Sequence, residues 1–139
     1  MGRFTVNGLD ALTADLAELA SFPDSVIEDL LNAEADVIEA EQRRTVRQML
    51  SGPYATGATA ASIKKGKVKK TSSGKTITVA PQGTNKRGTR HAEVLFINEY
   101  GKKGQPARPA VRTANARAEK PALDAGEKVF NDFLEKKGL

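Results

Sequence analysis

The stretch "DSVIEDLLNAEADVIEAEQRRTVRQMLSGP", residues 24–53, carries the longest helical pattern in this chain of 139 residues. Asp24 suits the N-cap position, and Gly52 followed by proline ends the pattern. The apolar positions at three- and four-residue spacing are Ile27, Leu30, Leu31, Val37 and Ile38. They predict a helix of roughly 25 residues, about twice the average length, which runs along the whole domain. Between Glu41 and Arg47 the same stripe turns polar, so we expect the helix to leave the core there or to meet a partner.

A second long helical pattern closes the chain from Ala110 onward. Its recurring small and apolar residues are Ala114, Ala118, Ala122, Ala125, Val129, Phe130 and Phe133. The alanines predict close approach of the backbone to a neighbouring element, most simply the helix that begins near Asp24. Pro121 interrupts the pattern, because a proline removes one backbone donor and clashes with the preceding turn. We therefore expect a kink or a new helix start near Lys120.

Short alternating segments fill the middle of the chain. "SIKKGKVKK" (62–70) and "KTITVAP" (75–81) predict two strands, joined by a Ser-Ser-Gly turn, with one apolar and one basic face. Residues 81–91 predict the tip of a long hairpin or a flexible loop. "AEVLFINEY" (92–100) has the strongest strand pattern, and its continuous apolar run predicts a central strand that is buried on both faces. On this strand we expect Glu99 to pair with a neighbouring arginine.

The N-terminal segment adds two smaller elements. "RFTV" (3–6) predicts a short strand, and a helical pattern follows it with Leu9, Leu12, Leu16 and Leu19 on one face. All these elements together predict an α+β fold in which a small, mostly antiparallel sheet packs against two long helices. The length suits a single domain, residues 1–139, with a flexible basic hairpin or loop around 64–90.

Composition argues against several kinds of site. Because the chain has no cysteine and one histidine, His91, we expect neither a thiolate metal site nor an imidazole cluster. The sequence shows no nucleophile and base pattern and no phosphate-binding glycine loop, so we expect no enzyme activity and no cofactor. No apolar run reaches the ~20 residues that cross a bilayer, and no secretory signal pattern begins the chain. We therefore expect a soluble protein without membrane contact.

Charge is divided unevenly along the chain. Residues 1–50 contain four Lys or Arg and ten Asp or Glu, a net charge of −6, whereas residues 51–139 contain eighteen and seven, a net charge of +11. The segment 64–90 has no acidic residue, and its basic residues are Lys64, Lys65, Lys67, Lys69, Lys70, Lys75, Lys86, Arg87 and Arg90. Such a segment needs abundant solvent or an anionic partner, either nucleic acid or an acidic surface on another copy of the chain. It contains no aromatic residue, which disfavours base stacking on single strands but leaves contact with backbone phosphates open.

The connection "NEYGKKGQPARPAVRTA" (98–114) combines glycines and prolines with positive charge. Gly101 and Gly104 permit turns, and Pro106 and Pro109 confine the chain to an extended path. Its basic residues are Lys102, Lys103, Arg108 and Arg112. The segment is either an ordinary connection into the last helix or a rigid basic loop that contacts a partner at low entropic cost.

Three motifs, in their order along the chain, resemble the tail-component family of long-tailed bacteriophages, whose members are tail-completion or head–tail joining proteins. The first motif is "PYATGATAASI" (53–63), the second is the apolar segment ending in "NEYG" (98–101), and the third is "GQPARPAVRTA" (104–114). The resemblance covers nearly the whole chain. The residues that match family positions are Thr56, Gly57, Ser62, Ile63, Glu99, Tyr100, Gly101, Pro106 and Pro109.

The resemblance implies a structural protein of the virion, assembled in the bacterial cytoplasm, with no small-molecule substrate. It implies a homo-oligomeric ring, a hexamer by likeness to the family, that completes the tail tube and joins it to the head. Its partners would be other copies, the tail-tube protein, head–tail connector proteins and, in passing, DNA.

The charge division adds a hypothesis for the ring, in which the acidic helices of one copy contact the basic hairpin of the next. The residues expected to contact another subunit or partner are Lys64, Lys65, Lys67, Lys69, Lys70, Lys86, Arg87, Arg90, Lys102, Lys103, Arg108 and Arg112. The alternative is a basic protein that binds double-stranded nucleic acid through the segment 64–90.

Overall fold

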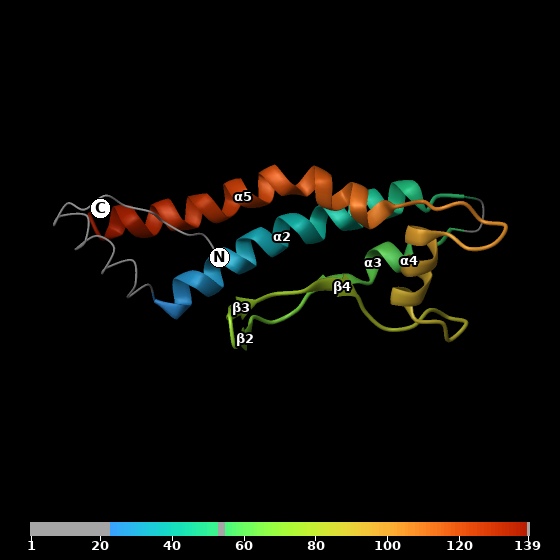
Figure 1. The fold of residues 1–139 in the computed structure, drawn as a ribbon, viewed down its shortest axis with the longest axis horizontal. Helices are drawn as coiled ribbons and strands as arrows, with labels where there is room; N and C mark the ends of the chain where they lie inside the picture. Colours follow the sequence, from blue (N-terminus) through green and yellow to red (C-terminus); the bar gives the residue numbers. More distant parts are fainter. Residues whose placement is uncertain (1–22, 53–54, 139) are drawn as a thin grey trace.

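The structure is a computed structural model that describes residues 23–52 and 55–138. The strand and the helix expected within residues 3–19 lie outside the described residues. The described elements, in chain order, are α2 (Asp24–Met49), α3 (Ala58–Ala61), β1 (Ile63–Lys65), β2 (Lys69–Thr71), β3 (Gly74–Thr76), β4 (Val79–Pro81), α4 (His91–Tyr100) and α5 (Ala110–Lys136). The expected α+β class is confirmed. Two long helices extend along the molecule, and the short elements lie on one side of them (Figure 1).

The helices α2 and α5 pack side by side and run in opposite directions (Figure 1). At a rise of 1.5 Å per residue, each is about 40 Å long. The buried residues of α5 are Ala110, Ala114, Ala118, Ala122 and Gly126, one in every four positions. Side chains this small let the two helix backbones approach closely. The predicted packing of the alanine run against the first long helix is therefore confirmed.

The polar second half of α2 remains in the core, so the expectation that the helix leaves the core between Glu41 and Arg47 is wrong. Gln42 and Thr45 are buried against α5. The Gln42 side-chain amide donates to the Asn115 Oδ1 at 2.8 Å, and the Arg117 guanidinium donates to the Thr45 hydroxyl at 3.4 Å. Polar side chains are tolerated there because each has a hydrogen-bond partner on the facing helix or one turn away.

Each long helix differs from the sequence expectation at one point. α2 begins at Asp24 itself, with Pro23 at the N-cap position and no side-chain cap. α5 continues through Pro121 without a new start near Lys120. Pro121 is exposed, whereas Ala118 and Ala122 on either side of it are buried. The packing of these neighbours against α2 holds the helix together across the hydrogen bond that proline cannot make.

The predicted hairpin is present but consists of two short ladders. β1 pairs with β4 in antiparallel register, with Ile63 opposite Pro81, and β2 pairs with β3, with Lys69 opposite Thr76. Between the ladders the backbone N–H of Gly66 donates to the carbonyl of Thr78 at 2.7 Å, which keeps the two arms together. The hairpin lies along α2 (Figure 1).

The predicted central strand at residues 92–100 is wrong, because this segment forms the helix α4. Its buried residues are His91, Leu95, Asn98 and Glu99, a spacing of three and four that is typical of a helix. In a central strand, Asn98 and Glu99 would alternate between two buried faces without partners. In the helix both side chains find partners on one side, which explains why the helical conformation is preferred.

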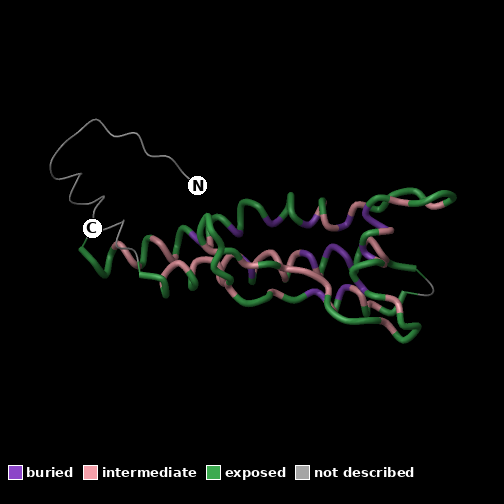
Figure 2. Tube along the Cα trace, turned by 60° about the horizontal axis from the view of Figure 1, so that its bottom comes forward, coloured by how far each residue is buried: buried purple, intermediate pink, exposed green. Residues whose placement is uncertain are grey.

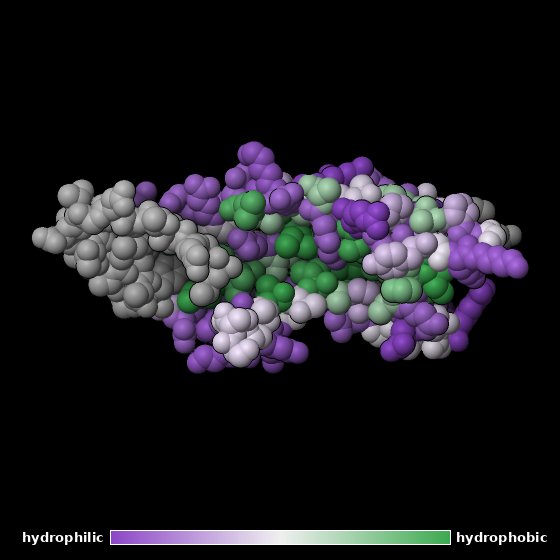
Figure 3. Space-filling view, viewed as in Figure 1, coloured by the Kyte–Doolittle hydropathy of each residue, from purple (hydrophilic) through white to green (hydrophobic). Residues whose placement is uncertain are grey.

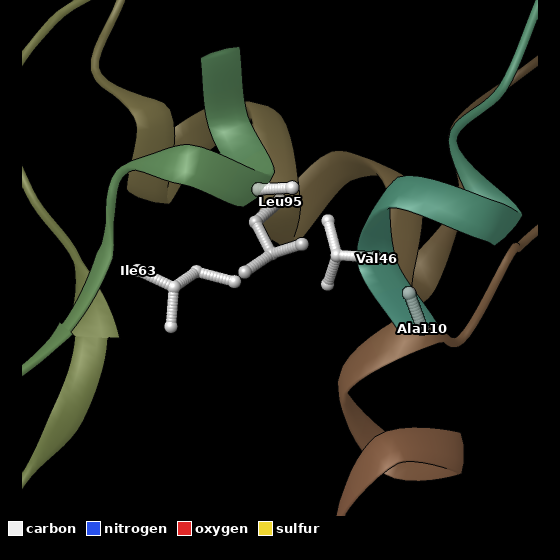
Figure 4. Close-up of a cluster of buried hydrophobic side chains, with 5 residues drawn as sticks. Val46, Ile63, Leu95 and Ala110 are labelled. Carbon is white, nitrogen blue, oxygen red and sulfur yellow. The ribbon is translucent and has the colours of Figure 1, made fainter. Parts of the chain in front are cut away.

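The apolar core is small and joins five elements. Val46 of α2, Ile63 of β1, Leu95 of α4 and Ala110 of α5 point toward one another, and Ala60 of α3 completes the cluster (Figure 4). Buried positions follow the inner sides of the helices, whereas the loops at the ends of the molecule are exposed (Figure 2). The core therefore lies at the end of the molecule where α3 and α4 meet the long helices.

Candidate assembly site

The three motifs, which are separate in the sequence, meet at this end of the molecule. Ile63, the last residue of the first motif, is fully buried in the core beside Leu95 and Ala110. Gly57 has a φ of +75° at the N-cap of α3, and the Ser62 hydroxyl donates to the Thr59 carbonyl at 2.6 Å. The Thr56 hydroxyl accepts from the backbone N–H of Ala58. The first motif thus forms a compact turn that positions Ile63.

Glu99 of the second motif caps the N-terminus of α5. Its two carboxylate oxygens accept hydrogen bonds from the backbone N–H groups of Val111, at 2.8 Å, and Arg112, at 3.0 Å. The side chain is buried, and its negative charge lies at the positive end of the helix dipole. Within the described residues, Glu99 therefore pairs with backbone groups and not, as expected, with an arginine side chain. Pro109, at the N-cap of α5, has no side chain that can cap the helix. A proline at this position was the signal in the sequence that a residue from another element supplies the cap.

Asn98, which sequence reasoning did not single out, ties the second motif to the third. Its side-chain oxygen accepts from the Arg108 guanidinium at 2.7 Å and from the Gln105 amide at 3.3 Å. Its backbone carbonyl accepts from the Arg108 N–H at 2.6 Å. Arg108 also donates to the backbone carbonyl of Met49 at 3.3 Å. Arg108 therefore joins α2, α4 and the connection within one subunit, although it was expected to contact a partner.

Gly101 allows the connection between α4 and α5 to fold back on itself. Its φ is +77°, and a Cβ at this position would lie 2.9 Å from the backbone N of Ala107 and the backbone O of Gln105. Lys102 and Gln105 exchange backbone hydrogen bonds of 3.0 and 2.9 Å. Pro106 is exposed and Pro109 is half-buried. The connection is therefore fixed by backbone contacts, as its glycines and prolines predicted.

Two lysines of the basic hairpin contact α2 of the same chain. The Lys65 Nζ lies 2.7 Å from the Asp36 Oδ1, and the Lys75 Nζ lies 3.0 Å from the Glu28 Oε1 and 3.6 Å from the Asp24 Oδ1. The hydrogen bond with Glu28 raises the pKa of Lys75. Part of the attraction that the sequence assigned to neighbouring copies is therefore used within one subunit.

Apart from Arg108, the remaining basic residues that were expected to contact a partner are exposed and form no ion pair with the described residues. They fall into two groups. The hairpin group consists of Lys64, Lys67, Lys69 and Lys70. The loop group lies before and after α4 and consists of Lys86, Arg87, Arg90, Lys102, Lys103 and Arg112.

The loop before α4 is held by the side chain of Asn85. Its Oδ1 accepts from the backbone N–H groups of Arg87, at 2.9 Å, and Thr89, at 3.0 Å. Thr84 and Arg90 form an antiparallel bridge across the base of this loop. The cationic side chains of the loop are thus carried on a hydrogen-bonded turn.

An apolar groove runs between α2, the hairpin and α5. It has a volume of about 830 Å³ and is lined by residues that include Leu31, Ile38, Ile77, Val79 and Glu34. Hydrophobic residues gather along the middle of this face, with hydrophilic residues on both sides (Figure 3). Burial in this region raises the pKa of the Glu34 carboxyl.

The described residues hold no group of three or more side chains suited to bind a metal ion. His91 is buried, and its Nδ1 lies 3.1 Å from the Thr59 hydroxyl, so its ring connects α4 to α3. None of the described helices combines the length and the apolarity that a membrane span requires. No protein-family model, no curated protein and no solved structure matches the chain.

Proposed function

We propose that this protein is a structural subunit of the head–tail junction of a long-tailed bacteriophage or prophage. In this role, copies of the chain form a ring that completes the tail tube and joins it to the head. The observation that carries the proposal is the convergence of the three family-like motifs, within 53–63, 98–101 and 104–114, on one hydrogen-bonded end of the molecule.

The nature of that end supports assembly rather than chemistry. Its polar side chains, among them Glu99, Asn98 and Arg108, are committed to hydrogen bonds that fix the backbone. A surface fixed in this way loses little entropy when it binds a neighbour. The start of α2 and the end of α5 lie at the opposite pole of the molecule (Figure 1). Such a rod can present one shaped end to the tail tube or to the connector.

Purified full-length protein tests this role. Light scattering at low and high salt and electron microscopy should show ring-shaped particles of several copies, formed alone or on addition of tail tubes from the phage that encodes the gene. On the tubes, the rings should cap one end. A protein that stays monomeric at every salt concentration and leaves both tube ends bare would overturn the proposal.

Binding of double-stranded DNA is the second candidate, and the exposed lysines of the hairpin favour it. Lys67, Lys69 and Lys70 lie on one arm of the hairpin and form no ion pair with the described residues. This function requires submicromolar binding that weakens steeply with salt. The double variant Lys69→Glu/Lys70→Glu should abolish it, whereas Lys120→Glu on α5 should not. Ring formation by a Lys69→Glu/Lys70→Glu variant that no longer binds DNA would favour the structural role.

A further inference from the structure

Three large apolar side chains are exposed among the described residues. They are Phe96 and Tyr100 on α4, each 63% exposed, and Leu123 on α5, 60% exposed. Large aromatic side chains left in water are typical of binding surfaces, where they supply much of the binding energy. Their surroundings indicate what they bind.

Phe96 and Tyr100 form an aromatic pair on α4, and the loops before and after this helix are positively charged. The residues lie one helical turn apart, with ring centroids 4.8 Å apart and ring planes at 52°. The loop before α4 carries Lys86, Arg87 and Arg90, and the connection after it carries Lys102 and Lys103, all exposed. The one exposed acidic residue on α4 is Glu93. We call the two rings and these five cations the aromatic patch.

Leu123 has the opposite surroundings. Glu119 and Glu127 lie four residues before and after it, so all three side chains project from the same face of α5. Both glutamates are exposed and form no ion pair in the described residues, whereas the nearby Asp124 is paired with Lys120 at 3.3 Å. We call Glu119, Leu123 and Glu127 the leucine patch. It has an apolar centre between two negative charges.

We propose that the aromatic patch of one subunit docks on the leucine patch of a second copy of this chain. The rings of Phe96 and Tyr100 cover Leu123, and the cations on either side of α4 face Glu119 and Glu127. Charge complementarity favours this pairing, because exposed cations lie in the loops before and after α4, whereas exposed glutamates lie one helical turn before and after Leu123. The contact joins two different surfaces, so repetition of it generates a ring or a filament rather than a closed dimer.

This contact rests on the proposed ring and assigns it an interface. It replaces the hairpin as the main contact, because Lys65 and Lys75 already neutralise acidic residues of their own α2. The proposed contact also differs from DNA binding, since DNA phosphates would bind the cations but would leave Leu123 without an apolar partner.

A complementation experiment tests the contact. The variants are Phe96→Ala/Tyr100→Ala, which removes the two rings of the aromatic patch, and Leu123→Ser, which removes the apolar centre of the leucine patch. The control is Lys128→Ser, which lies about 140° around α5 from Leu123. All four positions are exposed, so thermal unfolding should match that of the original protein. Light scattering should show that each variant alone fails to assemble, with association weakened at least tenfold, while the control assembles normally.

Mixing the two variants gives the decisive result. Each retains one intact patch, so an equal mixture should form a one-to-one dimer and nothing larger.

A second pair of variants tests the charges. Glu119→Lys/Glu127→Lys and Lys102→Glu/Lys103→Glu should each assemble poorly, and their mixture should associate again. A mixture of the Ala and Ser variants that stays monomeric, or variants that still form the original assembly, would overturn the contact. If the original protein forms rings but the variants give either of these contradicting results, the proposed contact is wrong and the proposed function stands. If the original protein neither forms rings nor caps tail tubes, the proposed function fails.

Discussion

At the scale of single residues, Glu99 makes the contact that most directly fixes the end of the molecule where the three motifs meet. Glu99→Ala leaves the N–H groups of Val111 and Arg112 without acceptors, so it should lower the free energy of unfolding by about 1–3 kcal/mol. Glu99→Gln keeps one acceptor but no charge, and should cost less. Urea unfolding measures both. The exposed Glu93→Gln serves as control and should change the stability by less than about 0.5 kcal/mol. Equal stabilities of all three variants would refute the capping role.

Two glycines in the connection permit a matched comparison. Gly101 and Gly104 both have positive φ, +77° and +80°, but a Cβ would strike backbone atoms at Gly101 alone. Gly104→Ala should cost only the conformational strain, about 1–2 kcal/mol. Gly101→Ala should cost clearly more, because the backbone of Gln105 and Ala107 has to move. Thermal unfolding of both variants tests this ranking, and the reverse order would contradict the folded-back connection.

Glu34 should make the stability depend on pH. Because burial raises its pKa in the folded protein, folding favours the protonated form, and ionisation of Glu34 weakens the fold as the pH rises above its ordinary pKa of 4.5. Glu34→Gln should therefore be more stable than the original protein at pH 7 and equal to it at pH 3.5. The control is Asp29→Asn, which is exposed. Chemical unfolding at the two pH values measures this difference in stability. A Glu34→Gln protein that is less stable than the original protein at pH 7 would disprove the predicted effect of Glu34.

The misassigned segment 92–100 shows where residue patterns were insufficient. Val94, Leu95, Phe96 and Ile97 fit a buried strand equally well, because a short apolar run carries no periodicity. The deciding information lay in Asn98 and Glu99, whose partners are the connection and the start of α5. These contacts exist only in the folded protein, so the pattern of residues 92–100 alone could not predict them.

At the scale of elements, the long helices were predictable and the small ones were not. α2 and α5 repeat their patterns over 26 and 27 residues, so a few exceptions such as Thr45 or Pro121 do not hide the period. The hairpin followed from its alternation and its glycine turn. The interruption of its ladders at Gly66 and the four-residue helix α3 depend on contacts with α2 and α4, which the local sequence does not specify.

Pro121 tests whether α5 is one continuous helix. In a helix interior, proline costs about 3 kcal/mol relative to alanine. Pro121→Ala should therefore raise the free energy of unfolding by about 1–3 kcal/mol, while Lys120→Ala beside it should change little. If a new helix began near Lys120, proline would suit the first turn, and the substitution would give almost no gain. Guanidinium unfolding of both variants separates the two cases.

At the scale of the whole molecule, the charge division predicted attraction but not its location. The acidic first half and the basic second half meet within one subunit, where Lys75 contacts Asp24 and Glu28. The sequence could not distinguish this from a contact between copies, because both satisfy the same charges. The loop group and the hairpin group remain exposed, and they are the cations that a neighbour can bind.

The most direct measurement of the proposed role in assembly uses the genome that encodes this chain, which the proposal identifies as that of a phage or prophage. After deletion of the gene, induced cells should contain DNA-filled heads and separate tails, and electron microscopy should show no joined particles. Expression of the intact protein from a plasmid should restore joining, whereas the Leu123→Ser variant should not. Intact, joined virions in the deletion strain would contradict the central claim that this protein builds the head–tail junction.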